Sequence, residues 1–194
     1  MSRIKPADDR AAAGSPSSDG SARELGEAID AIWAHRQAAY RGYVAARREL
    51  DESASLSPRL IELVRLRIAF HNQCSSCMAV RKQPDVVDEA AVCSLERPQD
   101  DVGLTDAERA ALDFADCFAT DHLAIDDKTY NGLRAHYSEG ELVELGIYCA
   151  YFVGFGRLTA TWLVVDELPE SFRAAPNGRT VTPWGHEDAL DFRS

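Results

Sequence analysis

Residues 56–81, LSPRLIELVRLRIAFHNQCSSCMAVR, join an apolar helical pattern to two cysteines at CxxC spacing. Ser57-Pro58 is typical of a helix start, with serine as the N-cap and proline at the first helical position. The polar pair Asn72-Gln73 interrupts the pattern and predicts a new helical turn at Cys74. Three residues separate Cys74 from Cys77, so both thiols fall on one helix face and can close a small disulfide ring. A thiol in a first helical turn is favoured as thiolate by the unpaired N–H groups there.

The rest of the chain also shows helical spacing of apolar residues, and no segment alternates like a strand. Arg67 falls inside the apolar face of the first pattern, which predicts a structural ion pair because an unpaired buried charge is very costly. We therefore expect an all-α fold of about six to eight helices. Helices are predicted over residues 22–49 with a break near Gly42, 58–70, 88–95, 105–118, 128–136 and 142–165 with a bend or a new helix near Gly156.

Composition and the positions of proline, glycine and helix-capping residues divide the chain into an arm, a domain and a tail. Residues 1–22 lack apolar anchors and predict a flexible or loosely attached arm. Residues 23–168 hold the helical patterns and form the predicted domain, whose last two long helices start at capping boxes, Thr105 to Glu108 and Ser138 to Glu141. Residues 169–194 are rich in proline and predict an extended tail that Trp184 and Phe192 attach to the domain or to a neighbouring subunit.

Charge and targeting signals narrow the expected partners and location. The formal net charge of −11 argues against nucleic acid and anionic membranes as partners. The first 23 residues contain no apolar core of a signal peptide, so we expect a cytoplasmic protein. The longest apolar run, residues 142–165, contains Glu144 and Arg157 and is interpreted as a buried helix rather than a membrane span.

The five cysteines do not suggest a disulfide framework, because their number is odd and no export signal precedes them. Cys93, Cys117 and Cys149 have no second ligand at short spacing, so a tetrahedral zinc site is not expected, and neither is a cofactor. Cys117 and Cys149 lie on apolar patterns and are predicted core residues. A thioredoxin-like site would need flanking strands. The pattern favours a redox dithiol on a helical scaffold.

Residues 62–77, ELVRLRIAFHNQCSSC, resemble the signature of the carboxymuconolactone decarboxylase superfamily, in particular its alkyl hydroperoxidase D-like branch. Residues 137–158, YSEGELVELGIYCAYFVGFGRL, are similar to that family's second conserved helix, and the resemblance covers roughly residues 25–165. It implies a helical bundle that assembles into homo-oligomers such as trimers or hexamers. It also implies a dithiol that reduces hydroperoxides or passes electrons between a dithiol reductant and a peroxiredoxin-type partner.

The resemblance also implies roles for individual residues. Cys77 stands where the family's cysteine is oxidised to sulfenic acid, and Cys74 stands where the resolving cysteine lies. Glu62 occupies the position that begins the family's proton relay. Ser76 and Arg81 stand where the family has two histidines, so that relay is incomplete here.

Three residues therefore carry alternative interpretations. Arg81 cannot act as a base, but its charge one turn from Cys77 is expected to favour the thiolate. His71, one turn before Cys74, could be the missing base or only a hydrogen-bonding group. Glu62 could start a relay or only pair with Arg65.

The leading hypothesis for the whole chain is a thiol-dependent peroxidase or disulfide oxidoreductase. The alternatives are a non-catalytic redox sensor or scaffold, and a decarboxylase-like enzyme. Decarboxylases of the superfamily lack the CxxC, which disfavours the last of these.

Overall fold

The computed structural model describes residues 2–7, 21–173 and 181–192, and the prediction of an all-α fold is confirmed. The helices are α1 (Ala22–Trp33), α2 (Gln37–Glu52), α3 (Pro58–His71), α4 (Ser75–Ala79), α5 (Glu89–Ser94), α6 (Asp106–Thr120), α7 (Asp127–Arg134), α8 (Glu139–Trp162) and α9 (Glu170–Arg173), with short 3₁₀ turns at Ala34–Arg36 and His122–Ala124. Two-residue strands, β1 (Val80–Arg81) and β2 (Leu190–Asp191), pair in parallel.

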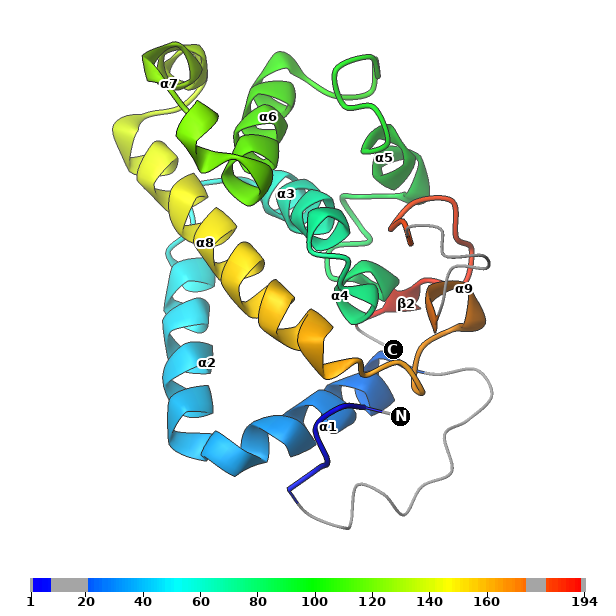
Figure 1. Ribbon diagram of the computed structural model, residues 1–194. Helices are drawn as coiled ribbons and strands as arrows, with labels where there is room; N and C mark the ends of the chain where they lie inside the picture. Colours follow the sequence, from blue (N-terminus) through cyan, green and yellow to red (C-terminus); the bar gives the residue numbers. More distant parts are fainter. Residues whose placement is uncertain (1, 8–20, 174–180, 193–194) are drawn as a thin grey trace.

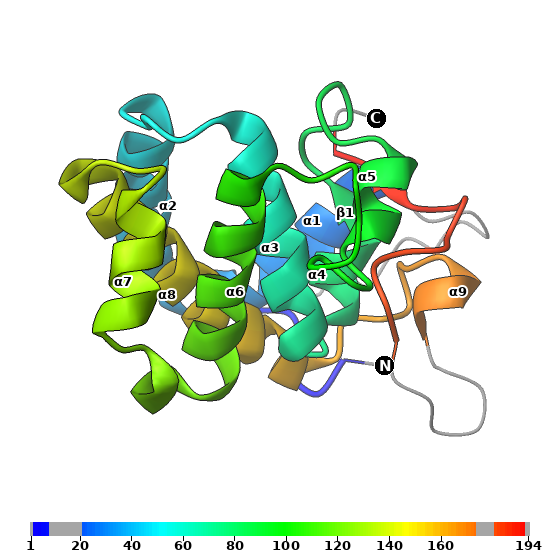
Figure 2. The same ribbon diagram turned by 90° about the horizontal axis from the view of Figure 1, so that it is seen from above.

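Helix α3 is the centre of the domain and packs against both α6 and α8 (Figures 1 and 2). Its side chains Leu63, Val64, Leu66 and Ile68 are fully buried. As predicted, the Ser57 side chain caps its start by accepting a hydrogen bond from the amide of Leu60. The predicted capping boxes at the starts of α6 and α8 are also present. Local caps and an apolar stripe thus account for the arrangement that carries the CxxC.

The first helical segment breaks at residues 34–36 and not at Gly42, which lies inside α2. Trp33 ends α1 and packs against Tyr40 and Trp162, each with ring centroids 5.1 Å away. These contacts hold the turn at Trp33, so that α2 leaves α1 at a steep angle and runs beside α8 (Figure 1). The prediction of a break at glycine was wrong because tertiary aromatic packing places it about two turns earlier.

Helix α8 is uninterrupted, so the prediction of a bend or new helix at Gly156 was wrong. The glycine serves a close approach instead: a Cβ there would lie 2.5 Å from Nδ2 of Asn72, the residue that ends α3. That Asn72 amide donates to the carbonyl of Phe152, 2.8 Å away. Helix α8 has the length and hydropathy of a membrane span, but Leu145 and Cys149 bury its inner face against the domain.

Both ends of the described chain attach to the domain. In the arm, the amide of Arg3 donates to the carbonyl of Trp162, while residues 8–20 lie outside the described part. In the tail, Trp184 packs on Phe70 at 4.9 Å as expected, and β2 pairs with β1. The extended interpretation was wrong at Glu170–Arg173, which forms α9, and the turn predicted at residues 176–178 lies outside the described residues.

Candidate functional site

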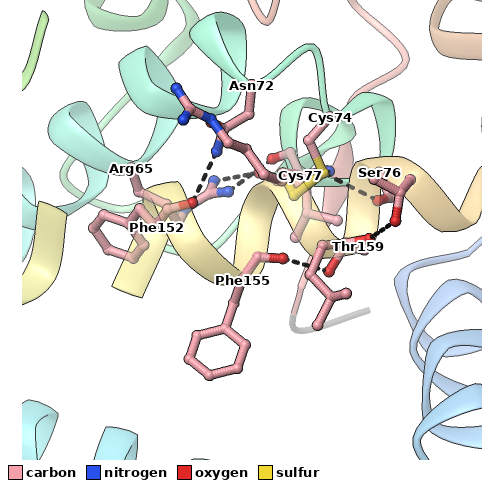
Figure 3. The surroundings of a disulfide bond; sticks show 12 residues. Arg65, Asn72, Cys74, Ser76, Cys77, Phe152, Phe155 and Thr159 are labelled. Carbon is pink, nitrogen blue, oxygen red and sulfur yellow. Dashed lines mark hydrogen bonds between the residues drawn. A yellow bond between two sulfur atoms is a disulfide. The ribbon is translucent and has the colours of Figure 1, made fainter. Parts of the chain in front are cut away.

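Cys74 and Cys77 form a disulfide at the start of α4, with Cα atoms 5.2 Å apart. Cys74 is the N-cap, and its sulfur accepts the amide of Cys77 at 3.3 Å. Cys74 is fully buried, whereas Cys77 keeps part of its surface and faces α8 (Figure 3). Cys93, Cys117 and Cys149 are free thiols. The predicted pairing is therefore present, and its accessible sulfur is that of Cys77.

The turn between α3 and α4 sets the position of the disulfide. Gln73 adopts a left-handed backbone with φ of 50°, which reverses the chain within two residues. Its side-chain amide donates to the carbonyls of Phe70 at 2.7 Å and of Val181 in the tail at 3.2 Å. The strained turn is therefore held from both α3 and the tail.

Arg65 of α3 holds the CxxC turn by hydrogen bonds to its backbone. Its guanidinium donates to the carbonyls of Cys77 at 2.7 Å and Val80 at 2.6 Å. The same group forms two 2.7 Å bonds with Glu62, and both side chains are at most 7 % exposed. This carbonyl-binding role was not predicted, although the three-residue spacing of Glu62 and Arg65 signals the pair itself.

Glu62 is held as a carboxylate. Burial raises its pKa, but Arg65 and the backbone amide of Lys82, 2.8 Å away, outweigh that effect and leave the pKa below its ordinary value. A proton relay needs a group that is protonated at some stage near neutral pH. The geometry therefore favours the ion-pair interpretation of Glu62 over the relay interpretation.

His71 belongs to a separate cluster. Its Nε2 lies 2.6 Å from Asp116, which also accepts two bonds from Arg67 at 2.7 and 2.9 Å. Burial raises the pKa of Asp116, but the hydrogen bonds and charges of His71 and Arg67 outweigh this effect, so the pKa lies below its ordinary value. The predicted ion pair of Arg67 is thus present, and the structure favours the hydrogen-bonding interpretation of His71.

Arg81 anchors the chain after α4. It is buried, forms an ion pair with Glu89 at 2.6 Å and donates to the carbonyls of Met78 and Pro183. Because the negative charge of Glu89 partly cancels the charge of Arg81, the electrostatic field of Arg81 at Cys77 is weaker than that of an unpaired cation. The arginine ties β1 to the tail.

A cavity of about 740 Å³ opens beside the disulfide, between α1 and α2 on one side and α3, α4 and α8 on the other. Cys77 and Ser76 form part of its wall, opposite Phe155 and Thr159 of α8 (Figure 3). Aromatic side chains make up much of the remaining wall: Trp33, Tyr40, Tyr43, Tyr151 and Phe192. Sequence reasoning missed this cavity, since its walls come from five helices, from the segment after α4 and from the tail.

Lys82 also lines the cavity and was not predicted. Burial of its amine, together with the nearby charges of Arg65 and Arg47, lowers the pKa of Lys82 to about 8. Lys82 as a whole is exposed, and its side chain forms part of the cavity wall. Its ammonium lies 5.3 Å from the ring of Phe192.

Among the described residues, no three His, Cys, Asp or Glu side chains gather as metal ligands. The site therefore consists of a dithiol pair, a buried ion pair beneath it and an aromatic cavity in front of it. No protein-family model and no curated protein matches the chain. The resemblance of residues 62–77 to the alkyl hydroperoxidase D-like branch remains a hypothesis that rests on those residues.

Proposed function

We propose that the protein is a thiol-dependent oxidoreductase that reduces hydroperoxides with the dithiol of Cys74 and Cys77. The observation that carries the proposal is the position of the disulfide: it closes at a helix start, with the sulfur of Cys77 on the wall of a cavity. A buried structural disulfide would not need such access. A dithiol that meets a small molecule does.

The reaction needs one cysteine that meets the peroxide and one that is protected from it. In the proposed reaction, the Cys77 thiolate attacks the outer oxygen of the hydroperoxide ROOH, the O–O bond breaks, and the alkoxide leaves as ROH after taking a proton. Cys77 then carries a sulfenic acid. Cys74 attacks its sulfur, the S–S bond forms, and the hydroxide leaves as water with one proton. A dithiol reductant restores both thiols by thiol–disulfide exchange, and is oxidised in their place.

Several features of the site support this division of labour. Cys74 is sealed inside the domain, so it can meet Cys77 but not a bulky peroxide. The sulfur of Cys74 accepts a hydrogen bond from the backbone amide of Cys77 at the first turn of α4. This arrangement favours negative charge on the Cys74 sulfur. Arg65 holds the carbonyl of Cys77 and keeps the two residues in register.

Steady-state consumption of cumene hydroperoxide, with dithiothreitol or dihydrolipoamide as the electron donor, tests the proposal. We expect turnover by the wild type and none by Cys77→Ser. Cys74→Ser should trap a sulfenic acid on Cys77 that reacts with dimedone. Cys93→Ser is the matched control, because Cys93 is an exposed free thiol on α5. Equal turnover by Cys77→Ser and wild type would refute the proposal.

A further inference from the structure

The cavity in front of Cys77 combines an apolar wall with one cation, Lys82, whose ammonium has no hydrogen bond or ion pair in the described part of the chain. The wall is continuous: Tyr43 lies 4.1 Å from Phe155 and 5.7 Å from Trp33 between ring centroids, and Tyr151 lies 5.6 Å from Phe155. Such a surface favours an aromatic or long apolar body, since stacking and burial both contribute. At about 740 Å³ the cavity has room for a ligand of drug-like size.

The charges around the Lys82 end are otherwise paired. Arg47 binds Asp51 through bonds of 2.8 to 3.0 Å, and Arg65 binds Glu62. Within residues 2–7, 21–173 and 181–192, the ammonium of Lys82 has neither a hydrogen bond nor an ion pair, and it lies 5.3 Å from the centre of the Phe192 ring.

The ammonium of Lys82 is therefore available to pair with an anion that binds in the cavity, through a charge-assisted hydrogen bond. The remaining acidic groups of the wall are also engaged. Asp30 accepts the hydroxyl of Tyr40, and Glu52 pairs with Arg48 at 3.6 Å. Around Lys82, three cations, Arg47, Arg65 and Lys82 itself, face two carboxylates, Glu62 and Asp51.

We propose that this cavity binds an amphipathic carboxylate, with its anionic group at Lys82 and its apolar or aromatic body against the wall of Trp33, Tyr43 and Phe155. Cys77 lies on the same wall, so a bound molecule faces its sulfur. Resting on the proposed function, the substrate is then an apolar hydroperoxide that carries a carboxylate. A small neutral peroxide would leave Lys82 unpaired and most of the apolar wall exposed to water.

Binding can be measured apart from thiol chemistry. The oxidised protein, with the Cys74–Cys77 disulfide intact, is titrated with 1-pyrenebutyrate and with the neutral 1-pyrenebutanol, using pyrene fluorescence. The two probes share one aromatic body and differ in the charged group. We expect the wild type to bind the acid at least about tenfold more tightly than the alcohol at pH 7.

Variants of Lys82 locate the charge. Lys82→Gln should remove the preference for the acid, and Lys82→Arg should keep most of it. Lys128→Gln on α7 is the matched control, because it removes an exposed lysine outside the cavity. Tyr43→Ala should weaken the binding of both probes by a similar factor. Because α2 carries no buried residue, loss of the Tyr43 ring changes the cavity wall rather than the core.

The pH dependence gives a second readout. Facing Lys82 are Arg65 and Glu62 of α3 and Arg47 and Asp51 of α2, and the pKa of Glu62 is held below its ordinary value by Arg65 despite its burial. Affinity for 1-pyrenebutyrate should therefore fall as the pH rises through about 8, the pKa of Lys82, while affinity for the alcohol stays constant. Lys82→Gln should abolish this fall.

The outcomes separate the two proposals. Equal affinity of acid and alcohol, or a preference unchanged in Lys82→Gln, overturns the carboxylate inference even if cumene hydroperoxide is consumed. A preference that depends on Lys82 supports the inference even if no peroxide is turned over, and in that case the proposed peroxidase reaction is the part that fails.

Discussion

Replacing Arg65 by methionine removes the group that holds the CxxC turn. Methionine keeps much of the side-chain length and apolar surface but cannot donate a hydrogen bond. The change leaves the Glu62 carboxylate, only 2 % exposed, without its countercharge. It also leaves the carbonyls of Cys77 and Val80 without their donors.

The structure bounds the size of the effect. Breaking a buried ion pair by removing one partner costs about 3–5 kcal/mol in the free energy of unfolding. The amide of Lys82 still donates to Glu62 at 2.8 Å, which places the expected cost at the lower end, about 3 kcal/mol. That is a large share of the roughly 5–15 kcal/mol by which a domain is stable. Arg23→Met is the matched control, since Arg23 and Glu27 form a surface pair that is 69 % and 63 % exposed.

Urea unfolding of the oxidised proteins, followed by circular dichroism at pH 7, measures both costs. Arg65→Met should lower the free energy of unfolding by about 3 kcal/mol, and Arg23→Met by well under 1 kcal/mol. In the wild type the lowered pKa of Glu62 adds stability above pH 4.5 that is lost in acid. In Arg65→Met only Lys82 still opposes the effect of burial, so the pKa of Glu62 is higher than in the wild type and this stability is reduced. The difference between the two proteins should therefore shrink as the pH falls through 4.5. Equal costs for the two variants at pH 7 would refute the account of the turn.

Three further predictions follow from other contacts. Gly156→Ala places a Cβ against Asn72 and should be about 1–3 kcal/mol less stable than Gly146→Ala, which meets nothing within 4 Å, in the same urea assay. Arg81→Met should release β2 from β1, seen as faster exchange of the Phe192 amide that donates to the Arg81 carbonyl; unchanged exchange would argue against the anchoring role. We also propose a homo-oligomer, so light scattering should give at least twice the 21.3 kDa chain mass, and a monomer mass at micromolar concentration would contradict it.

Local chemistry made much of the fold predictable. The caps at Ser57, Thr105 and Ser138 lie within four residues of the amides they bind, so the sequence shows them directly. The CxxC pairing is equally local, because a separation of three residues fixes its reach. The ion pair of Arg67 followed from the cost of a buried charge, although its partner Asp116 could not be named in advance.

Features that depend on distant neighbours were not predictable. The break after Trp33 depends on its packing against Trp162, and the role of Gly156 depends on Asn72. The lone cation at Lys82 is visible only when the paired charges around it are placed in space. The cysteine pair of the site was thus predictable from its sequence spacing, whereas the cavity beside it depends on the packing of distant helices.

One single-turnover experiment tests the central claim most directly. The protein is fully reduced, the reductant is removed, and cumene hydroperoxide is added at less than one equivalent while thiols are counted and mapped by mass. The account predicts that each peroxide consumes two of the five thiols, yields one alcohol and forms the Cys74–Cys77 disulfide, with Cys93, Cys117 and Cys149 still reduced. Peroxide that persists, or thiols lost from Cys93 rather than from the pair, would contradict it.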